Sequence, residues 1–284
     1  MLRYSRPVPP SDSVRARFAA LVAAPDDAID LTEAALLIAA EAYPGLDAAR
    51  YVRMLDDLAA AVASGQRGPA SDAERVRQLV RFLAVERGFR GNQDDYYDRR
   101  NSYLNEVLER RLGIPITLAL VYMAVAGRLG LVLLGVGFPG HFLVKHPGAS
   151  ELVIDPFAGT FVDLQECARR LRAVLGPDTR LDPSHLRAAT AREILVRMLR
   201  NLKQVYLQAR ELEPALACSE RILLVEPGLA HELRDRGLLY EQLECFAAAR
   251  TDLERFLALV PDDPSADTVR ARLIEIGRHG ATLH

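Results

Sequence analysis

Three side chains that can do acid–base or nucleophilic chemistry follow one another along the middle of the chain. Thr117 lies in the first turn of an expected apolar helix, His141 begins a β-type run directly after Gly140, and Asp155 ends the next run. A histidine that a carboxylate orients can act as a general base toward an alcohol or a water. Each residue also has a structural interpretation: His141 can hold a turn, and Asp155, which precedes Pro156, can end its strand in an Asx-turn. The order nevertheless predicts a polar His141–Asp155 site, with Thr117, His141 and Asp155 as a degenerate catalytic triad.

The residue at the start of the helix decides which activity to expect. In papain- and transglutaminase-like enzymes this position holds a cysteine, whose pKa the helix dipole and a neighbouring imidazolium lower. Here it holds Thr117, and a helix dipole does not activate an alcohol as it activates a thiol. We therefore expect the Thr117 hydroxyl to satisfy a free amide of the first helical turn. The chain's three cysteines all follow this position: Cys167, Cys218 and Cys245.

Polar residues before the helix have two open interpretations. Asn105 and Glu109 share a helix face, which is typical of a solvated surface with weak pairings. Alternatively, some of these side chains line the mouth of the His141 site together with a glycine of the turn. The candidate lining residues are Asn101, Asn105, Glu106 and Gly140.

The sequence contains fragments of cofactor and metal motifs, but none has the flanking structure or the spacing that such a site needs. Gly135 to Gly140 has the spelling G-x-G-x-x-G, but a strand follows it where a dinucleotide site needs a helix, and Pro139 removes an amide donor. The acidic cluster at 94–98 lacks the spacing of a calcium loop. No cysteine pair has zinc spacing. We expect neither a cofactor nor a metal ion.

The elements that must position these residues form an α+β, mostly α fold. Apolar residues at helical spacing predict helices after Asp30, over 48–63 and from Ser71 to about Arg87, then a short helix at 102–111 and the apolar helix that starts at Pro115. Past Gly130 the period changes to two, which predicts a small antiparallel sheet from runs at 131–136, 142–145 and 152–154. We expect three parts: an N-terminal helical part at 1–66, a core at 67–183, and helical repeats at 184–284.

The last third of the chain repeats itself at the length of a tetratricopeptide helix pair. Four pairs of identical residues are 34 positions apart: Tyr206 and Tyr240, Ala215 and Ala249, Leu223 and Leu257, and Pro227 and Pro261. Small residues at Gly237 and Ala249 should let helices approach closely. The first copy is weaker, because Lys203 stands where the second copy has Gly237. A capping helix is expected at 265–276, and a long helix from about Ser184 to Arg210 should dock on the core.

Composition and charge exclude several classes of protein. Of 284 residues, 50% are apolar and 26% charged, as in an ordinary globular protein, and 36 basic residues nearly balance 38 acidic ones. No basic face or recognition module favours nucleic acid, and the apolar run from Ile116 to Ala126 is too short to span a membrane. Met1 to Ser13 shows no secretory leader. These features predict a cytoplasmic protein.

Three longer motifs resemble one family. They are the run from Asn101 to Leu118, Phe138-Pro-Gly-His-Phe-Leu-Val144, and Ile154-Asp-Pro-Phe157. Together they resemble the bacterial SirB-type "invasion regulator" family, which joins a transglutaminase-like domain to tetratricopeptide repeats. The resemblance implies a transglutaminase/cysteine-protease-like core that typically carries Ser or Thr at the cysteine position.

Two functions from different classes follow. The first is a non-catalytic protein, a pseudoenzyme, that binds a peptide or protein partner through its C-terminal repeats and keeps a polar His141–Asp155 pocket. The alternative is an amide or acyl hydrolase, or an acyltransferase, with His141 as base, Asp155 orienting it, and Thr117 or a water as nucleophile. The missing thiol favours the first.

Overall fold

The computed structural model describes residues 10–65 and 68–281, and the chain divides into two compact units, one ending at Leu195 and one beginning at Val196. The division falls inside helix α8 (Ala191–Gln208). The prediction that this helix starts near Ser184 is wrong, because Pro183–Leu186 forms a separate 3-10 turn and α8 begins at Ala191. The predicted boundaries at 66/67 and 183/184 stay predictions. Residues 1–9 of the N-terminal stretch lie outside the described residues.

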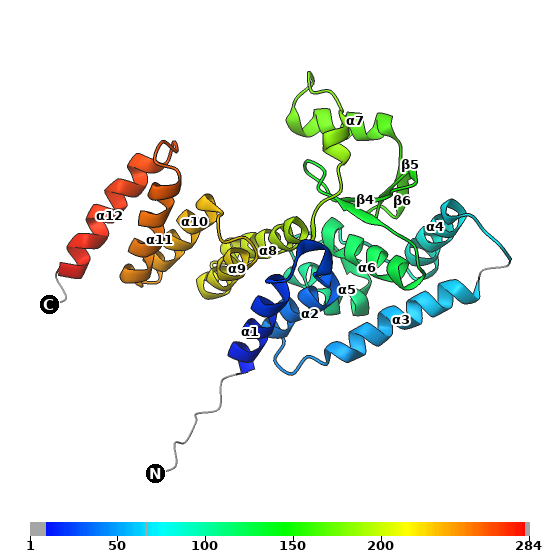
Figure 1. The fold of residues 1–284 in the computed structure, drawn as a ribbon, viewed down its shortest axis with the longest axis horizontal. Coiled ribbons are helices and arrows are strands. Elements are labelled where there is room, and N and C mark those ends of the chain that lie inside the picture. The colour runs from blue at the N-terminus through cyan, green and yellow to red at the C-terminus, as the bar shows by residue number, and fades with distance from the viewer. Residues whose placement is uncertain (1–9, 66–67, 282–284) are drawn as a thin grey trace, which may run out of the picture. The chain divides into compact units, whose positions relative to one another are not determined.

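The first unit contains most of the helices that the sequence predicts (Figure 1). Two predicted start signals are confirmed: the Asp30 carboxylate accepts from the amides of Thr32 and Glu33, and Ser71 forms a capping box with Glu74. The helices are α1 (Pro10–Val22), α2 (Leu31–Ala42), α3 (Ala48–Ser64), α4 (Asp72–Arg81), α5 (Leu104–Arg110), α6 (Pro115–Arg128) and α7 (Leu164–Leu175).

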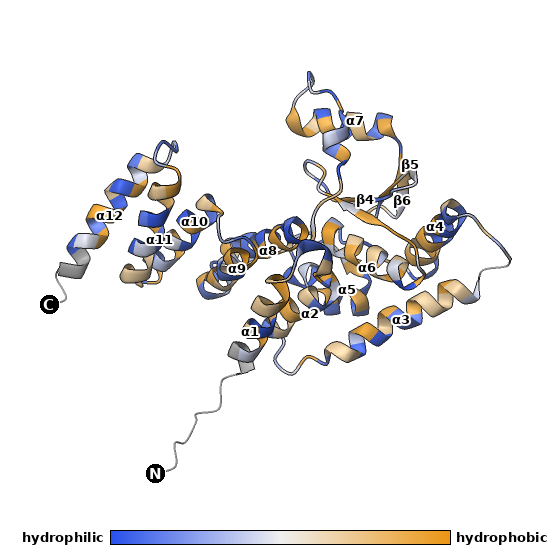
Figure 2. Ribbon diagram, viewed as in Figure 1, coloured by the Kyte–Doolittle hydropathy of each residue, from blue (hydrophilic) through white to orange (hydrophobic). Residues whose placement is uncertain are grey.

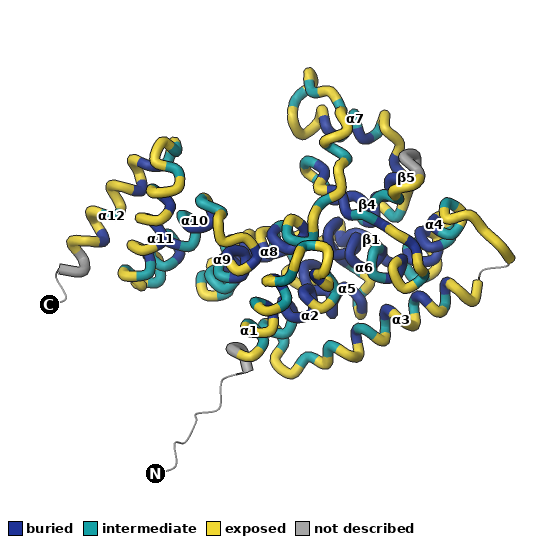
Figure 3. The backbone as a smooth tube through the Cα atoms, in the orientation of Figure 1, coloured by how far each residue is buried: buried dark blue, intermediate teal, exposed yellow. Residues whose placement is uncertain are grey.

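Helix α6 is the core of this unit. Pro115 occupies its first turn, where a missing amide costs nothing, and ten of its residues are buried. It packs against α2, α3, α4 and α5 as well as strand β4. Figure 2 shows it as mostly hydrophobic and Figure 3 shows it as mostly buried. A helix that is apolar on all sides is stable only when other elements surround it.

A four-stranded antiparallel sheet follows α6, as predicted. Its strands are β3 (Leu134–Val136), β4 (Leu143–His146), β5 (Ala149–Asp155) and β6 (Thr160–Val162), in the order β3-β4-β5-β6. The sequence did not predict β6, which has three residues, only one of them buried. One face of the sheet packs Val136, Leu143 and Val153 against Cys167 and Leu171 of α7. Because side chains alternate along a strand, Val144 and Ile154 face the other way.

A short parallel pair of strands positions the loop before α5 beside the start of α6. β1 (Arg90–Gly91) pairs with β2 (Leu112–Gly113), and the Asn92 amide donates to the Gly113 carbonyl over 3.1 Å. The start of α8 joins the same unit, since the Ala189 amide donates to Gly135 O and the Asp26 carboxylate caps Ala191 and Arg192. The expected docking of this helix is therefore confirmed for its first turn.

The second unit contains the predicted repeats. It comprises the rest of α8, then α9 (Leu212–Val225), α10 (Ala230–Gln242), α11 (Phe246–Leu259) and the predicted capping helix α12 (Ala266–Ala281). The close approach at Gly237 is confirmed: a Cβ there would lie 2.8 Å from Leu253 Cγ and 3.3 Å from the Ala249 carbonyl oxygen. None of the helices within the described ranges is long and apolar enough to cross a lipid bilayer.

Lys203, the residue that breaks the repeat, is buried in an ion-pair network. Its Nζ lies 2.6 Å from Glu232 Oε1 and 3.2 Å from Asp235 Oδ2, and the Ser219 hydroxyl donates to the same Glu232 oxygen over 2.6 Å. Lys203 is 7% exposed and Glu232 2%. Such charges are tolerated in a core only when each has its partner.

We expect Lys203→Met to lower the free energy of unfolding by about 3 kcal/mol, because the buried Glu232 would lose its close cation and keep only Arg200, whose Nε lies 3.8 Å away. The double variant Lys203→Met/Glu232→Met should lose less than the sum of the two single variants. Urea unfolding of the full chain for all four proteins measures this coupling. Additive losses would contradict a mutual dependence of the two charges.

Candidate functional site

His141 and Asp155 form a close pair between two parts of the sheet. Gly140 adopts a positive φ of 69° in the turn before β4, and the His141 amide closes this turn by donating to the Phe138 carbonyl over 3.0 Å. Asp155 ends β5. The His141 Nε2 atom lies 2.8 Å from Asp155 Oδ1. The structure thus brings together the two residues that the sequence singled out.

The Asp155 carboxylate has four partners and is 2% exposed. Besides His141, its Oδ1 accepts from the backbone amides of Phe157 and Ala158 over 3.0 and 3.2 Å. Its Oδ2 accepts from Arg170 Nη1 of α7 over 2.6 Å. Arg170 is itself held by Glu166, to which its Nε donates over 2.7 Å. Asp155 therefore both forms the predicted Asx-turn and orients His141.

Charges around Asp155 keep it ionised. Burial alone would raise its pKa, but the hydrogen bonds and positive charges of His141 and Arg170 outweigh burial and lower the pKa to about 2. An ionised carboxylate only accepts hydrogen bonds, so His141 Nε2 carries a proton in this pair. Asp155 thereby fixes the orientation of the imidazole and the tautomer of its neutral form.

The Phe157 ring forms one wall of this site. Its centroid lies 6.0 Å from that of His141, edge to face, and 6.0 Å from that of Tyr96. The Gly91 amide donates to the Phe157 carbonyl over 2.8 Å, and a Cβ on Gly91 would lie 2.4 Å from three ring atoms. Only glycine fits at this contact. The loop after β1 is thereby packed onto the turn that contains the Asp155 partners.

Thr117 lies in the first turn of α6 and is 1% exposed. Its hydroxyl donates to the Asn101 carbonyl, with 2.7 Å between the oxygens, and accepts from the Ile114 amide over 3.2 Å. The Ile114 carbonyl is a second acceptor at 3.1 Å. The hydroxyl thus satisfies an amide at the helix start, as its position predicts, and links α6 to the segment around Asn101.

The four candidate lining residues have different environments. Asn101 is fully buried: its amide nitrogen donates to the carbonyls of Asp95 and Tyr96, and its side-chain oxygen accepts from Asn92. It therefore holds the loop that carries Tyr96. Gly140 lies against Val174 of α7, 2.8 Å from where its Cβ would be.

The other two lining candidates are on α5. Asn105 is 4% exposed and lies beside Tyr51 of α3, whose hydroxyl donates to Glu109 over 2.8 Å. Glu106 is partly buried in the first turn of α5. The solvated surface that the spacing suggested therefore does not include Asn105, because α5 packs that side against α3. Lining of the His141 site by Asn105 and Glu106 stays a prediction.

Four contributors to the site were not predicted from the sequence. Gly91, Phe157 and Arg170 are described above. The fourth, Tyr122 on α6, is fully buried and its hydroxyl has no partner among the residues that the structure describes. Burial together with the Asp155 charge raises its pKa far above the usual value. Arg170 had a weak signal, since it follows Glu166 by one helical turn.

The two buried cysteines are not activated thiols. Cys167 packs under the sheet, and burial raises its pKa. Burial also raises the pKa of Cys218 to about 12. Both changes oppose the thiolate that a nucleophile or a metal ligand needs. Across residues 10–65 and 68–281, no group of three or more His, Cys, Asp or Glu side chains is placed to hold a metal ion.

We expect Gly91→Ala to destabilise the protein by about 1–3 kcal/mol, because the new methyl group would overlap the Phe157 ring. Gly127→Ala is the matched control: it lies in a helix with no atom within 4 Å of the new Cβ, so it should leave stability unchanged or raise it. Thermal unfolding of both variants measures the difference. Equal midpoints would contradict the close packing of Phe157 on Gly91.

The lowered pKa of Asp155 predicts acid sensitivity. The group binds a proton near pH 4 when unfolded but only near pH 2 when folded, so its stabilisation is complete above about pH 4 and is lost as the pH falls toward 2. The free energy of unfolding of the wild type should therefore fall by about 2 kcal/mol more over this range than that of Asp155→Asn. Urea unfolding at several pH values tests this; parallel profiles would contradict it.

Comparison with known proteins agrees with this arrangement. Residues 49–200 match the transglutaminase-like superfamily, and residues 202–274 match a tetratricopeptide repeat. The chain is 42% identical to a UPF0162 protein of Xylella fastidiosa strain 9a5c over 264 residues, which cover 91% of this chain and 94% of that protein.

Two further relatives are from other bacteria. A UPF0162 protein of Pseudomonas aeruginosa is 40% identical over 83% of this chain and 86% of its own length. Protein SirB1 of Salmonella typhimurium is 31% identical over 75% of this chain and 80% of its own. No solved structure matches the chain significantly. The chain therefore belongs to the UPF0162/SirB1 family, in which a transglutaminase-like domain precedes tetratricopeptide repeats.

Proposed function

We propose that this protein is a non-catalytic binding protein that recognises a peptide or protein partner. In this proposal the repeats present the binding surface and the His141–Asp155 pair is a retained polar pocket. The observation that carries the proposal is the state of the Thr117 hydroxyl, which is buried and committed to the Asn101 carbonyl and the Ile114 amide.

A nucleophilic hydroxyl must give its proton to a base. The Thr117 proton points to a carbonyl 2.7 Å away, and a carbonyl is not a base that can accept it. The same hydroxyl accepts from the Ile114 amide at the start of α6, so moving it toward a substrate would leave that buried amide with only the longer contact to the Asn101 carbonyl, at 3.4 Å. Both features support a structural role for Thr117.

The pair itself supports recognition of a polar ligand. Asp155 is fully compensated, while the His141 side chain is 21% exposed. A partly exposed imidazole of fixed orientation beside the Phe157 ring offers polar and aromatic contact at one place. These are the elements of a small specificity pocket.

The repeats support a macromolecular partner. Stacked helix pairs bury only the faces between neighbours and leave an extended surface that such proteins use for binding. We further propose a cytoplasmic location, since the described cysteines are all free.

One observation favours the second candidate, a hydrolase that uses water. The compensated Asp155 orients a histidine, and such a histidine can deprotonate a water as well as an alcohol. In that case His141 is the base, Asp155 positions it, and Thr117 takes no part.

We expect His141→Ala to weaken binding of peptides selected on the wild-type protein from a displayed random library, measured at a temperature at which the variant is folded, because loss of this Asp155 partner should also lower the thermal midpoint. His185→Ala is the matched control, because His185 also lies beside an aspartate, Asp182, in the same unit. Binding of the selected peptides by fluorescence anisotropy measures the effect. Equal loss in both variants would contradict a specific role for His141.

The same proteins, with Thr117→Val added, test the enzymatic candidate on pooled fluorogenic amide and ester substrates. We expect no turnover by the wild type above that of His141→Ala. Turnover that His141→Ala abolishes and Thr117→Val leaves intact would replace the binding proposal by a water-using hydrolase. Turnover that is lost in Thr117→Val, although this variant keeps the thermal midpoint of the wild type, would contradict the structural role given to that residue.

A further inference from the structure

We propose that the first unit binds a neutral, largely apolar small molecule in a cavity between α1, α2, α3 and α6. The cavity has a volume of about 790 Å³ and shares no residue with the His141 site. Pockets of 300–1,000 Å³ enclose most of the surface of a small organic ligand. The proposal is independent of the partner-binding function above.

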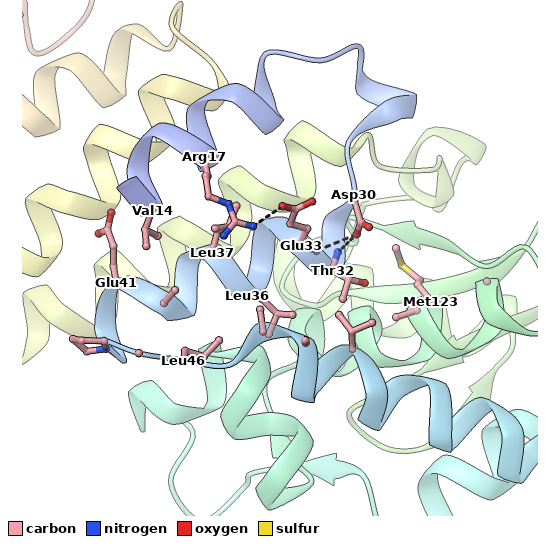
Figure 4. Close-up of a pocket in the computed structure, with 18 of the residues that line it drawn as sticks. Val14, Arg17, Asp30, Thr32, Glu33, Leu36, Leu37, Glu41, Leu46 and Met123 are labelled. Atoms are coloured by element: carbon pink, nitrogen blue, oxygen red, sulfur yellow. Dashed lines mark hydrogen bonds and ion pairs between the residues drawn. The ribbon is translucent and has the colours of Figure 1, made fainter. Parts of the chain in front are cut away.

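The walls of the cavity come from helices that face each other with small side chains. Helix α3 contributes Ala48 and Ala49, and α6 contributes Ala124 and Gly127. Leu36 and Leu37 of α2 also line the cavity, with Val14 of α1 on one side of them and Met123 of α6 on the other (Figure 4). Small residues on two facing helices leave space that their own side chains do not fill. Met123 is half-buried and adapts readily to an irregular ligand.

The charged residues of the walls are each engaged within the protein. Arg17 Nη2 donates to Glu33 Oε1 over 3.2 Å, as Figure 4 shows, and Arg128 Nε donates to Asp56 Oδ1 over 2.5 Å. Asp30 caps α2. Glu41 pairs with Arg15 at 3.5 Å.

This pairing decides the class of ligand. An anionic ligand would have to separate Arg17 or Arg128 from its carboxylate or enter apolar walls without a counter-charge. A cationic ligand would have to draw Glu33 or Glu41 from its arginine, or the Asp30 carboxylate from the amides that it caps, and each of these costs free energy. A neutral ligand loses nothing in this way and gains from burial against Leu36, Leu37 and Met123. Thr32, which is half-buried at the edge of the cavity, adds a hydroxyl for one polar group.

The ends of the cavity favour a small molecule over a helix of another protein. Arg17 and Val14 of α1 lie on one side, and the turn between α2 and α3, with Pro44, Gly45 and Leu46, lies on another. A docked helix needs a groove that continues over several turns with anchors at regular spacing. Here α1, α2, α3 and α6 surround a compact space, which fits a small organic molecule better than a helix.

A pair of matched dyes tests the proposal on the full chain. 1-Anilinonaphthalene is neutral, and its 8-sulfonate has the same rings with a negative charge; both fluoresce in apolar sites, and the chain has no tryptophan to interfere. We expect saturable one-to-one binding of the neutral dye, at least about tenfold tighter than that of the sulfonate.

Two variants fill the cavity from opposite walls. Gly127→Leu adds a side chain where no atom lies within 4 Å of the new Cβ, and Ala49→Leu extends an exposed residue of α3. Each should weaken binding of the neutral dye at least about tenfold while the thermal midpoint is kept. Gly277→Leu in α12 is the control, since it is also helical with open space around the new Cβ, and it should bind like the wild type.

Three results would overturn the proposal: unchanged binding in both filled variants, equal affinity for the two dyes, or equal loss in the Gly277→Leu control. His141→Ala should bind the dye like the wild type. Loss of peptide binding with intact dye binding, or the reverse, separates the failure of one proposal from the failure of the other.

Discussion

The carboxylate of Asp155 joins the sheet, helix α7 and the turn after β5 in the first unit. A charge that is 2% exposed is stable only if the fold supplies its partners, and here four groups come from three places: His141 before β4, Arg170 on α7, and two amides of the turn after β5. The sheet, its covering helix and the turn must therefore be in place together. The pair that resembles a catalytic dyad is also the point at which these elements join.

At the start of α6, a neutral group, the Thr117 hydroxyl, likewise joins separate segments by satisfying buried polar atoms. An apolar helix whose first turns are buried has amide groups at its start that water cannot reach. Thr117 meets that need, and in doing so it binds the segment at Asn101, which in turn holds the loop of Tyr96. Thr117, which stands where a transglutaminase-like enzyme has its nucleophile, thus holds the segments of the site together.

Local patterns in the sequence predicted much of this. The capping residues Asp30 and Ser71, the apolar helix at Pro115 and the 34-residue period each reflect short-range physics, and each is confirmed. The order of His141 and Asp155 also predicted their pairing. The contact of Arg170 with Asp155 and the role of Gly91 could not be found in this way, because they depend on which surface α7 and Phe157 meet after folding. Strand β6 is too short to give a pattern, and the burial of Asn105 comes from the packing of α3 on α5.

The buried Lys203 has a consequence for how each repeat avoids pairing with a helix of the wrong repeat. Lys203 stands 34 positions before Gly237, and Ser219 stands 34 before Leu253, so two polar residues that both bond Glu232 occupy the positions that make the glycine–leucine contact in the next repeat. Similar repeats can exchange partners within a chain or between two chains. An exchange by one repeat would place the Lys203 ammonium against Leu253, without Glu232. The difference between the two copies therefore distinguishes the native order of helices from the exchanged one: in the native order the Lys203 ammonium has Glu232 as its counter-ion, and in the exchanged order it does not.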